Sequence, residues 1–413
     1  MAGLPERLRV TADKPRVLVL SRSYPNNVME LLGLWVQAQV RHLARTHEIK
    51  VVSPVPYCPP LPGLPENYAR FRRVLKSRLD GTIEVFHPRM LVGPGYSTHS
   101  IEWRLYLASV SPLVKRIQQR FPVDLIHAHF TYPDGAVAVE LGRRYGVPVV
   151  ITEQNPWGSW LNKYPSVRQK SIWTAEHSTR HIAISQAVRR TIEEFAGTLN
   201  HLVVIPDGVN QDEFTLGPPG QERDPNQILF VGAIRPVKGV DVLIQAMQRL
   251  IARRPEIRLV LIGEAFFGPY RQEELRLKRM AVELGLGDRI QFSGKQPLDE
   301  LVRQMQRSAA LVLSSRAESL GMVLVEALAC GTPVVATRCG GPEDIVNEQV
   351  GVLVEPEDPE ALATGIERVL DNGGRYHPQS LRSFVLERFG LESVGARLAS
   401  VYQEALRARL VPS

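Results

Sequence analysis

The sequence predicts an α/β protein with two doubly wound parallel sheets, and two observations carry this prediction. Short β-rich runs alternate with helical segments through most of the 413 residues, which is the pattern of repeated βαβ units. The alternation breaks at a stretch rich in Pro, Gly and polar residues (211–227) and then restarts. A chain of this length also exceeds what one hydrophobic core usually holds, so we expect a domain on each side of this linker.

The first domain is expected over residues 1–210. Its strands are predicted at RVLVLS (16–21), EIKVVSPV (48–55), VDLIHAHF (123–130), VPVVITEQ (147–154), RHIAIS (180–185) and LVVIPDGV (202–209). Helical segments such as LWVQAQVRHLART (34–46) and DGAVAVELGRRYG (134–146) lie between them. Strands joined through helices of this length favour parallel pairing.

The second domain is expected over residues 228–395. Its strands are predicted at ILFVGAI (228–234), IRLVLIG (257–263), RIQFSG (289–294), ALVLSS (310–315) and PVVAT (333–337). A last helix is expected at 396–413, and its return to the first domain is left open. Ligands of open parallel sheets bind beyond the carboxyl ends of the strands, so the default site is a cleft between two facing domains.

Composition argues against several other classes of protein. No run reaches the roughly 18 apolar residues of a bilayer span, and the amino terminus lacks the apolar core of a signal peptide. Three cysteines without CxxC spacing do not fit a disulfide framework or a zinc site, so we expect a cytoplasmic location. The sequence contains no GxGxxG run, which argues against a nicotinamide dehydrogenase. The sequence also has no basic stretch interleaved with aromatic residues that could stack on bases, which argues against nucleic-acid binding.

The charge is unevenly distributed along the chain. Residues 1–200 carry 26 Lys or Arg against 15 Asp or Glu, a net of +11, whereas residues 201–413 carry 24 against 28, a net of −4. The first half therefore either faces an anionic partner or simply has a basic surface. The segment NYARFRRVLKSRLDG (67–81) is predicted to form a basic amphipathic helix. Such a helix could rest on the inner face of the cell membrane or present an ordinary solvated face, and an irregular loop is the further alternative.

The segment ESLGMVLVEALACGTPVVATRCGG (318–341) indicates where an anion binds. A buried strand precedes it, and a helix is predicted over MVLVEALACG (322–331), so the amides of Gly321, Met322 and Val323 would form an unpaired helix N-terminus. We expect a diphosphate there, between Glu318 and Glu326, whose carboxylates suit sugar hydroxyls. Alternatively, Glu318 caps the helix and Glu326 is solvated.

This segment resembles the glutamate–seven residues–glutamate signature of family 4, the retaining glycosyltransferases with the GT-B fold. The likeness covers almost the whole chain, through SYPNNVMELLGLWVQAQVRHLA (23–44), IHAHFTYPDG (126–135), IPDGVNQDEF (205–214), VGAIRPVKGVDVLIQA (231–246) and GVLVEPEDPEALATGI (351–366). The resemblance implies two facing Rossmann-like domains, with a UDP- or GDP-linked sugar on the second and the acceptor on the first. It also implies hexosyl transfer without a metal or other cofactor, and the sequence has no Asp-x-Asp motif.

Without a metal, fixed cations and amide dipoles must stabilise the leaving diphosphate. Lys238 falls on the lysine of the family pattern. Many relatives carry an arginine directly after the glycine, but Ala233 stands there and Arg235 follows two residues later, either on the phosphates or in solvent. The predicted donor site comprises Gly232, Arg235, Lys238, Glu318, Ser319, Leu320, Gly321, Met322, Val323 and Glu326. Lys238, Arg235, Glu318 and Gln154 are the predicted catalytic residues.

The acceptor side is predicted to involve Gly33, His129, Glu153 and Gln154. Gly33 permits either close approach of a phosphate or the entry into a helix. His127 and His129 share one strand face, but no further ligand spacing completes a metal site, so no metal is predicted and His127 is expected in the core. Gln154 stands where relatives commonly carry a histidine. It can donate a hydrogen bond but cannot hold a positive charge.

The predicted function is a retaining glycosyltransferase that moves a sugar from a nucleotide sugar to an alcohol. The basic first half favours a lipid-linked or oligosaccharide acceptor in polysaccharide or glycolipid biosynthesis. A small metabolite or natural product as acceptor is an alternative. A binding subunit without turnover is another, and the replaced histidine and displaced arginine favour it. Sugar, base, linkage and oligomeric state are not predicted.

Overall fold

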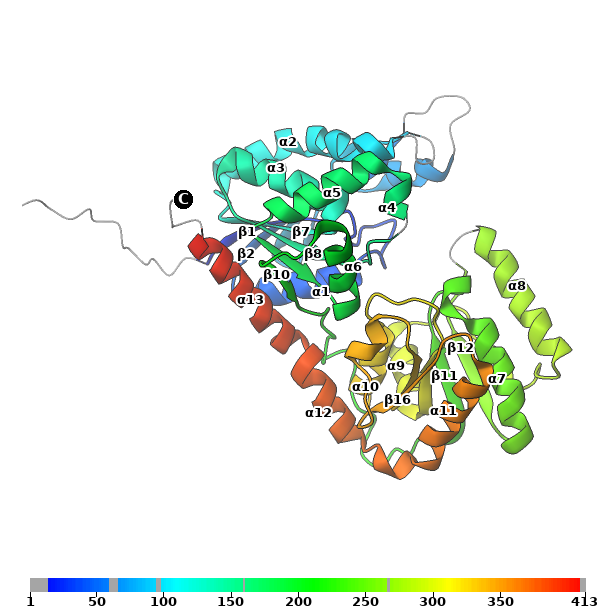
Figure 1. Ribbon diagram of the computed structural model, residues 1–413. Helices are drawn as coiled ribbons and strands as arrows, with labels where there is room; N and C mark the ends of the chain where they lie inside the picture. The colour runs from blue at the N-terminus through cyan, green and yellow to red at the C-terminus, as the bar shows by residue number, and fades with distance from the viewer. Residues whose placement is uncertain (1–13, 59–65, 94–97, 159, 266–267, 409–413) are drawn as a thin grey trace, which may run out of the picture. The chain divides into compact units, whose positions relative to one another are not determined.

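The computed structural model describes residues 14–58, 66–93, 98–158, 160–265 and 268–408 (Figure 1). It confirms the α/β class and the two parallel sheets expected from the alternating pattern. The first sheet has eight strands in the order β10-β9-β8-β7-β1-β2-β5-β4, and the second has six in the order β13-β12-β11-β14-β15-β16. Two short strands, β3 and β6, pair separately in parallel.

The strands of the first half follow the predicted runs closely. They are β1 (Arg16–Leu20), β2 (Glu48–Val52), β3 (Val55–Tyr57), β4 (Ser77–Asp80), β5 (Ile83–Phe86), β6 (Arg89–Leu91), β7 (Leu125–His129), β8 (Val149–Glu153), β9 (Arg180–Ala183) and β10 (Leu202–Val204). The central strand β1 is almost entirely buried between β2 and β7, which explains its continuous apolar sequence.

Helices cover both faces of this sheet. They are α1 (Leu34–Leu43), α2 (Glu102–Arg120), α3 (Ala136–Tyr145), α4 (Trp160–Lys163), α5 (Pro165–His177) and α6 (Gln186–Ala196), with short turns η1 (Glu66–Arg73), η2 (His99–Ile101) and η3 (Thr131–Gly135). Figure 1 shows α2, α3 and α5 on one face of the sheet and α1 on the other. This is the doubly wound arrangement.

The second sheet is parallel throughout. Its strands are β11 (Asp224–Val231), β12 (Arg258–Ile262), β13 (Ile290–Phe292), β14 (Ser308–Leu313), β15 (Val334–Thr337) and β16 (Gly351–Val354). β11 begins within the stretch that the sequence assigns to the linker. Asp224 there pairs with Ser308 of β14, and the register shifts before Ile228 resumes the ladder.

The helices of the second half lie between these strands and after them. They are α7 (Val240–Arg253), α8 (Gly268–Glu283), α9 (Leu298–Arg307), α10 (Met322–Ala329), α11 (Pro359–Asp371), α12 (Pro378–Phe389) and α13 (Leu391–Ala408), with η4 (Pro236–Lys238), η5 (Gly341–Asp344) and η6 (Gly373–Arg375). Strand β14 and helix α10 are the predicted strand and helix around Glu318. No described helix is both long and apolar enough to cross a membrane.

The prediction of a basic amphipathic helix over 67–81 is wrong. Residues 66–73 form the 3-10 helix η1, but residues 77–80 form β4, which pairs antiparallel with β5. The hairpin register pairs Asp80 with Ile83, so Gly81 and Thr82 form a two-residue loop, and Gly81 has a φ of 60°. The sequence Asp-Gly-Thr therefore acts as a hairpin signal that outweighs the helical spacing of the apolar residues.

The chain divides into two compact units. Unit 1 contains residues 1–152, 164–180 and 399–413, and unit 2 contains residues 153–163 and 181–398. The core of unit 1 includes Leu18, Leu20 and Ile126 from the sheet. The end of α13 belongs to this unit. There the Tyr402 hydroxyl lies 2.7 Å from Nδ1 of His127, whose Nε2 lies 2.8 Å from the Thr152 hydroxyl.

Candidate functional site

The predicted lysine and the first predicted glutamate meet in unit 2. Lys238 ends η4, beyond the carboxyl end of β11, and Glu318 follows the carboxyl end of β14. Because β11 and β14 are neighbours in the sheet, their loops adjoin, and the Lys238 ammonium lies 2.5 Å from the Glu318 carboxylate. The Ser315 hydroxyl donates to the same Glu318 oxygen at 2.6 Å. The pair lies where open parallel sheets bind ligands.

Arg316 fixes the loop that carries Lys238. Its guanidinium binds both carboxylate oxygens of Asp241, at 3.0 and 3.1 Å, and its backbone N–H donates to the carbonyl of Val237 at 2.7 Å. Burial of Asp241 opposes its ionisation, but the hydrogen bonds and charge of Arg316 outweigh burial and lower the pKa of Asp241. Sequence reasoning missed both residues. Their pairing depends on which strands are neighbours, which the motif does not reveal.

Gly239 permits the close approach of this loop to β14. Its φ of 61° is in the left-handed region, and a Cβ atom there would lie 2.0 Å from the carbonyl oxygen of Ser314. The Ser314 hydroxyl donates to the carbonyl of Lys238 at 3.0 Å. A larger residue at position 239 would push the loop, and Lys238 with it, away from Glu318.

Helix α10 begins at Met322, directly after this pair. Gly321 precedes it in a left-handed conformation, and the first turn leaves backbone N–H groups without helical partners. Ser319 and the buried Leu320 form the connection from Glu318. The backbone of Glu318 is held by bonds to Cys339 and Gly341, so the start of the helix is positioned relative to the acid. An anion placed here would meet Lys238 and the helix dipole together.

Glu326 lies on α10 and is partly buried. Burial, with the negative charge of Glu213, raises the pKa of Glu326 to about 7. This environment favours the predicted ligand-binding role of Glu326 over the solvated alternative, since a fully solvated carboxyl would not be shifted in this direction. A carboxylate that is costly to ionise and makes no ion pair among the described residues suits an incoming diol, which supplies two hydrogen-bond donors.

This raised pKa predicts a pH-dependent gain in stability for Glu326→Gln. The unfolded chain ionises this glutamate near its usual pKa, whereas the folded protein ionises it only near 7, so its burial costs increasing free energy as the pH rises between these values. We expect the free energy of unfolding to rise in the variant by about 2 kcal/mol more at pH 8 than at pH 5. Thermal-unfolding midpoints at both pH values, with the exposed Glu387→Gln as control, measure this difference. Equal gains at both pH values would contradict the assignment.

The other donor-side predictions lie near Lys238 in the chain. Gly232 follows β11, and its N–H donates to the carbonyl of Ile262 at the end of β12. Arg235 is exposed and precedes η4 with an extended backbone. Both therefore belong to the loop that Arg316 fixes.

Gln154 and Glu153 are buried in unit 2 and engaged in local hydrogen bonds. The Gln154 amide donates to Asp207 at 3.2 Å. The Glu153 carboxylate accepts from the N–H groups of Gln154 and Asn155, each at 3.0 Å, and from the Trp157 indole at 3.1 Å. Glu153 therefore organises its own loop, and three donors already occupy its carboxylate.

The other two acceptor-side predictions lie in unit 1. Gly33 precedes α1 with a φ of 70°, and a Cβ atom there would lie 2.0 Å from the carbonyl oxygen of Ser23, so only glycine permits this close approach of the two segments. His129 ends β7 and is 1% exposed. Its ring lies 4.5 Å from that of His127, and burial lowers the pKa of both. Among the described residues, no three His, Cys, Asp or Glu gather as metal ligands.

A polar cluster that sequence reasoning missed lies at the carboxyl edge of β1 in unit 1. Arg22 donates to the fully buried Asp134 from its backbone N–H (2.7 Å) and its side chain (3.3 Å), and to Glu102 at 2.5 Å. The Tyr106 hydroxyl donates to Asp134 at 3.2 Å. Burial raises the pKa of Asp134 to about 6, although Arg22 opposes this. Arg22 directly follows the strand predicted at 16–21, and Asp134 lies in the segment IHAHFTYPDG (126–135). Their positions in the sequence could therefore have marked both as candidate site residues.

This cluster borders a pocket of about 360 Å³ in unit 1. Its polar lining includes Arg22, Asn26, Thr98, His99 and Glu102, and its apolar lining includes Phe71 and Met90. Since two carboxylates face the single arginine, the pocket suits neutral hydroxyl-bearing molecules better than phosphates. It can therefore position an alcohol.

Comparisons with known proteins show which families and folds the chain resembles. A family model described as "Glycosyl transferases group 1" matches residues 213–383, and one described as "Glycosyltransferase Family 4" matches residues 32–213. A D-inositol 3-phosphate glycosyltransferase of Thermobispora bispora is 32% identical over 317 residues, which cover 70% of this chain and 73% of that relative.

Two solved structures share the fold. Sucrose-phosphate synthase from Thermosynechococcus elongatus superposes with a TM-score of 0.76 at 20% identity, over 96% of this chain and 100% of that one. Anabaena Alr3699/HepE, in complex with UDP, superposes with a TM-score of 0.71 at 18% identity, over 94% of this chain and 99% of that one. At these identities the likeness shows the architecture alone.

Proposed function

The chain belongs to the family 4 glycosyltransferases, and on that premise we propose that it transfers a sugar from a nucleotide sugar to an alcohol with retention of anomeric configuration. The observation that carries the proposal is the contact between Lys238 and Glu318 at the start of α10. A cation, a carboxylate and a helix N-terminus in one place match a sugar diphosphate, which offers negative charge next to hydroxyl groups.

The diphosphate of the donor lies against the first turn of α10 and the Lys238 ammonium. Glu318 accepts from hydroxyls of the sugar, and Glu326 from those of the ribose. The acceptor oxygen attacks the anomeric carbon on the face that the phosphate leaves. The bond to the phosphate oxygen breaks as the new glycosidic bond forms, and the acceptor proton passes to the leaving phosphate. Lys238 and the helix amides stabilise the charge that develops there, so the step needs no metal.

The acceptor hydroxyl belongs to a sugar of a lipid-linked or oligosaccharide chain, and the enzyme acts in cell-surface polysaccharide or glycolipid biosynthesis, in the cytoplasm or at the inner face of the membrane. The net positive charge of residues 1–200 supports such an anionic setting. The pocket beside Arg22, where two carboxylates face one guanidinium, supports a neutral hydroxyl group at the point of transfer.

A second candidate acceptor is a small phosphorylated polyol. The name of the Thermobispora relative favours it, since that protein is described as acting on D-inositol 3-phosphate. The charge balance around Arg22 disfavours it, because Asp134 and Glu102 already neutralise the arginine.

Release of nucleoside diphosphate from a panel of UDP- and GDP-linked sugars tests the proposal. Release is expected with a lipid-linked or oligosaccharide acceptor, with chelator present, and the product should keep the anomeric configuration of the donor by NMR. Release with inositol phosphate alone would establish the second candidate. If the protein binds a nucleotide sugar but releases no nucleoside diphosphate with any acceptor, it is a binding subunit. An inverted product would contradict the mechanism.

A further inference from the structure

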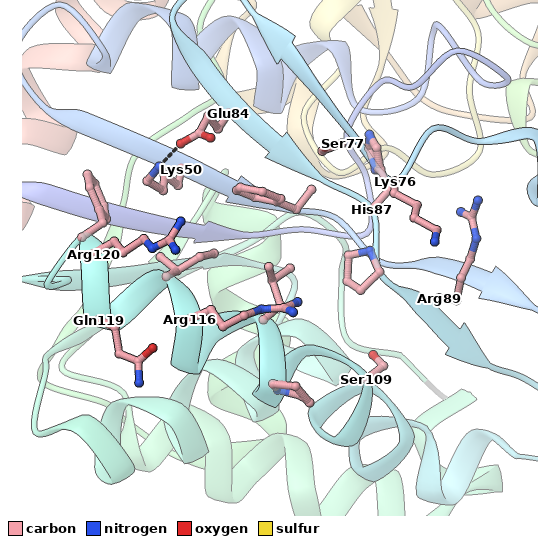
Figure 2. Close-up of a pocket in the computed structure, with 16 residues that line it drawn as sticks. Lys50, Lys76, Ser77, Glu84, His87, Arg89, Ser109, Arg116, Gln119 and Arg120 are labelled. Carbon is pink, nitrogen blue, oxygen red and sulfur yellow. Dashed lines mark ion pairs between the residues drawn. The ribbon is translucent and has the colours of Figure 1, made fainter.

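A second, strongly basic pocket lies in unit 1, between helix α2 and strands β2 and β5, and has a volume of about 750 Å³. We define this basic pocket by its cationic and imidazole side chains, which are Lys50, Lys76, His87, Arg89, Arg116 and Arg120. Figure 2 shows Arg116 and Arg120 on the α2 side, and Lys76, His87 and Arg89 on the strand side. Two separate elements therefore contribute positive groups to one hollow.

The positive charge of the basic pocket is not compensated. One carboxylate lines it, Glu84, and this pairs with Lys50. Among the described residues, no carboxylate pairs with Lys76, Arg89, Arg116 or Arg120. Like charges repel across an empty hollow, so four such side chains raise the affinity of the pocket for an anion.

Two polar atoms in the wall of the basic pocket lack hydrogen-bond partners. These are Nη1 of Arg89 and Nε2 of His87, a residue that is 1% exposed. Nη2 of Arg89 already donates to the carbonyl of Val74. Nδ1 of His87 lies 2.9 Å from the carbonyl of Ser53, which can only accept, so Nδ1 carries the proton and Nε2 of the neutral ring can only accept. The wall thus holds one charged donor and one neutral acceptor, both buried, which a ligand meets when the Arg89 and His87 side chains turn into the hollow.

Burial keeps the His87 ring neutral. It lowers the pKa of His87, and the charges of Arg78 and Arg89 lower it further, although the bond to Ser53 opposes this. A ligand that satisfies both wall atoms must therefore present an acceptor oxygen to Arg89 and an O–H group to His87. Leaving either atom unpaired when the ligand covers the pocket would cost free energy.

We propose that the basic pocket binds a phosphate monoester. The monoanion of such a group carries both acceptor oxygens and a P–OH donor, and with a second pKa near 6 it is a minor form at pH 7 that becomes the major one below pH 6. Sulfate and phosphodiesters offer acceptor oxygens only. Arg116 and Lys76 supply the outer contacts to the phosphate. The side chains of Phe86, Leu113 and Phe121 line the pocket as well and accommodate an apolar part of the ligand.

The basic pocket is separate from the pocket beside Arg22. Strand β6 contributes to both, with Arg89 in the basic pocket and Met90 in the other. Successive residues of a strand point to opposite sides, so the two pockets lie on opposite sides of β6. The proposed phosphate site is therefore not the place of sugar transfer, and its test does not depend on the transfer reaction.

Thermal unfolding of the full chain at constant ionic strength, with and without inorganic phosphate, tests the proposal. Phosphate is expected to raise the midpoint, and sulfate at the same ionic strength is expected to have less effect. Arg116→Glu should weaken phosphate binding at least about tenfold, since it removes one charge-assisted contact and adds a repulsion. Lys115→Glu is the matched control, because Lys115 is the adjacent exposed cation on α2 and does not line the pocket.

Sedimentation with vesicles identifies the source of the phosphate. Retention on phosphatidic acid vesicles above that on phosphatidylglycerol vesicles of equal charge, lost in Arg116→Glu, assigns a lipid headgroup. Stabilisation by inorganic phosphate without such retention assigns a soluble phosphate monoester. The proposal fails if sulfate stabilises as well as phosphate, if neither stabilises, or if Lys115→Glu weakens binding as much as Arg116→Glu. Nucleoside diphosphate release should stay unchanged in Arg116→Glu, which separates this site from the transfer site.

Discussion

Replacing Lys238 with alanine is expected to lower kcat about 100- to 1,000-fold, with a smaller change in the KM for the nucleotide sugar. The ammonium lies 2.5 Å from Glu318 at the start of α10, and the charge on the leaving diphosphate grows as the glycosidic bond breaks. An interaction that strengthens toward the transition state affects turnover more than binding. Steady-state rates of nucleoside diphosphate release measure both constants.

Lys278→Ala is the matched control for this prediction. Lys278 also pairs with a glutamate in unit 2, at 2.7 Å from Glu274, but on the exposed surface of α8. It should leave kcat unchanged. A Lys238→Ala enzyme with undiminished turnover would remove the lysine from the site, and a loss confined to KM would make it a binding residue only.

Asp134→Ala is expected to destabilise unit 1 by about 3 kcal/mol. Asp134 is fully buried and receives three hydrogen bonds, two from Arg22 and one from Tyr106. Its removal leaves a partly buried guanidinium with Glu102 as its only carboxylate partner among the described residues, and a phenol without an acceptor. Unpaired buried polar groups cost more free energy than the bond itself contributed. The thermal-unfolding midpoint measures the loss.

The contrasting variant is Glu193→Ala. Glu193 pairs with Arg189 one turn away on α6, and both side chains reach solvent, so the expected cost is about 0.5 kcal/mol or less. If Asp134→Ala lowers the midpoint no more than Glu193→Ala does, the buried cluster around Arg22 does not stabilise the unit.

Local pattern was enough to predict most of the secondary structure. The run at 16–21 became β1 because its continuous apolar sequence fits a strand buried on both faces. The helix beyond Glu318 ends near Gly331 as predicted, because glycine accepts the left-handed conformation there. The failure at 67–81 has a local cause as well. Apolar spacing over so short a segment does not decide between a helix and a hairpin when Asp-Gly stands between two candidate strands.

The residues of the candidate site could be singled out one by one from the sequence, but which of them lie together could not be predicted. Lys238 and Glu318 are 80 positions apart and touch because β14 adds beside β11, a choice of strand order that no local pattern encodes. The same limit hid Arg316 and Asp241, and Arg22 with Asp134. Each pair joins segments that follow neighbouring strands, so the partner of each residue could not be read from its own stretch of sequence.

The bond between Tyr402 and His127 has a consequence for the synthesis of the chain. The two residues are 275 positions apart, and at about 5–20 residues per second the ribosome needs on the order of tens of seconds to span that distance. During this time the histidine and its neighbour Thr152 have left the exit tunnel, but their aromatic partner does not yet exist. His127 therefore lacks this hydrogen bond until synthesis has passed Tyr402, so this contact of β7 can form only after the intervening chain has been made.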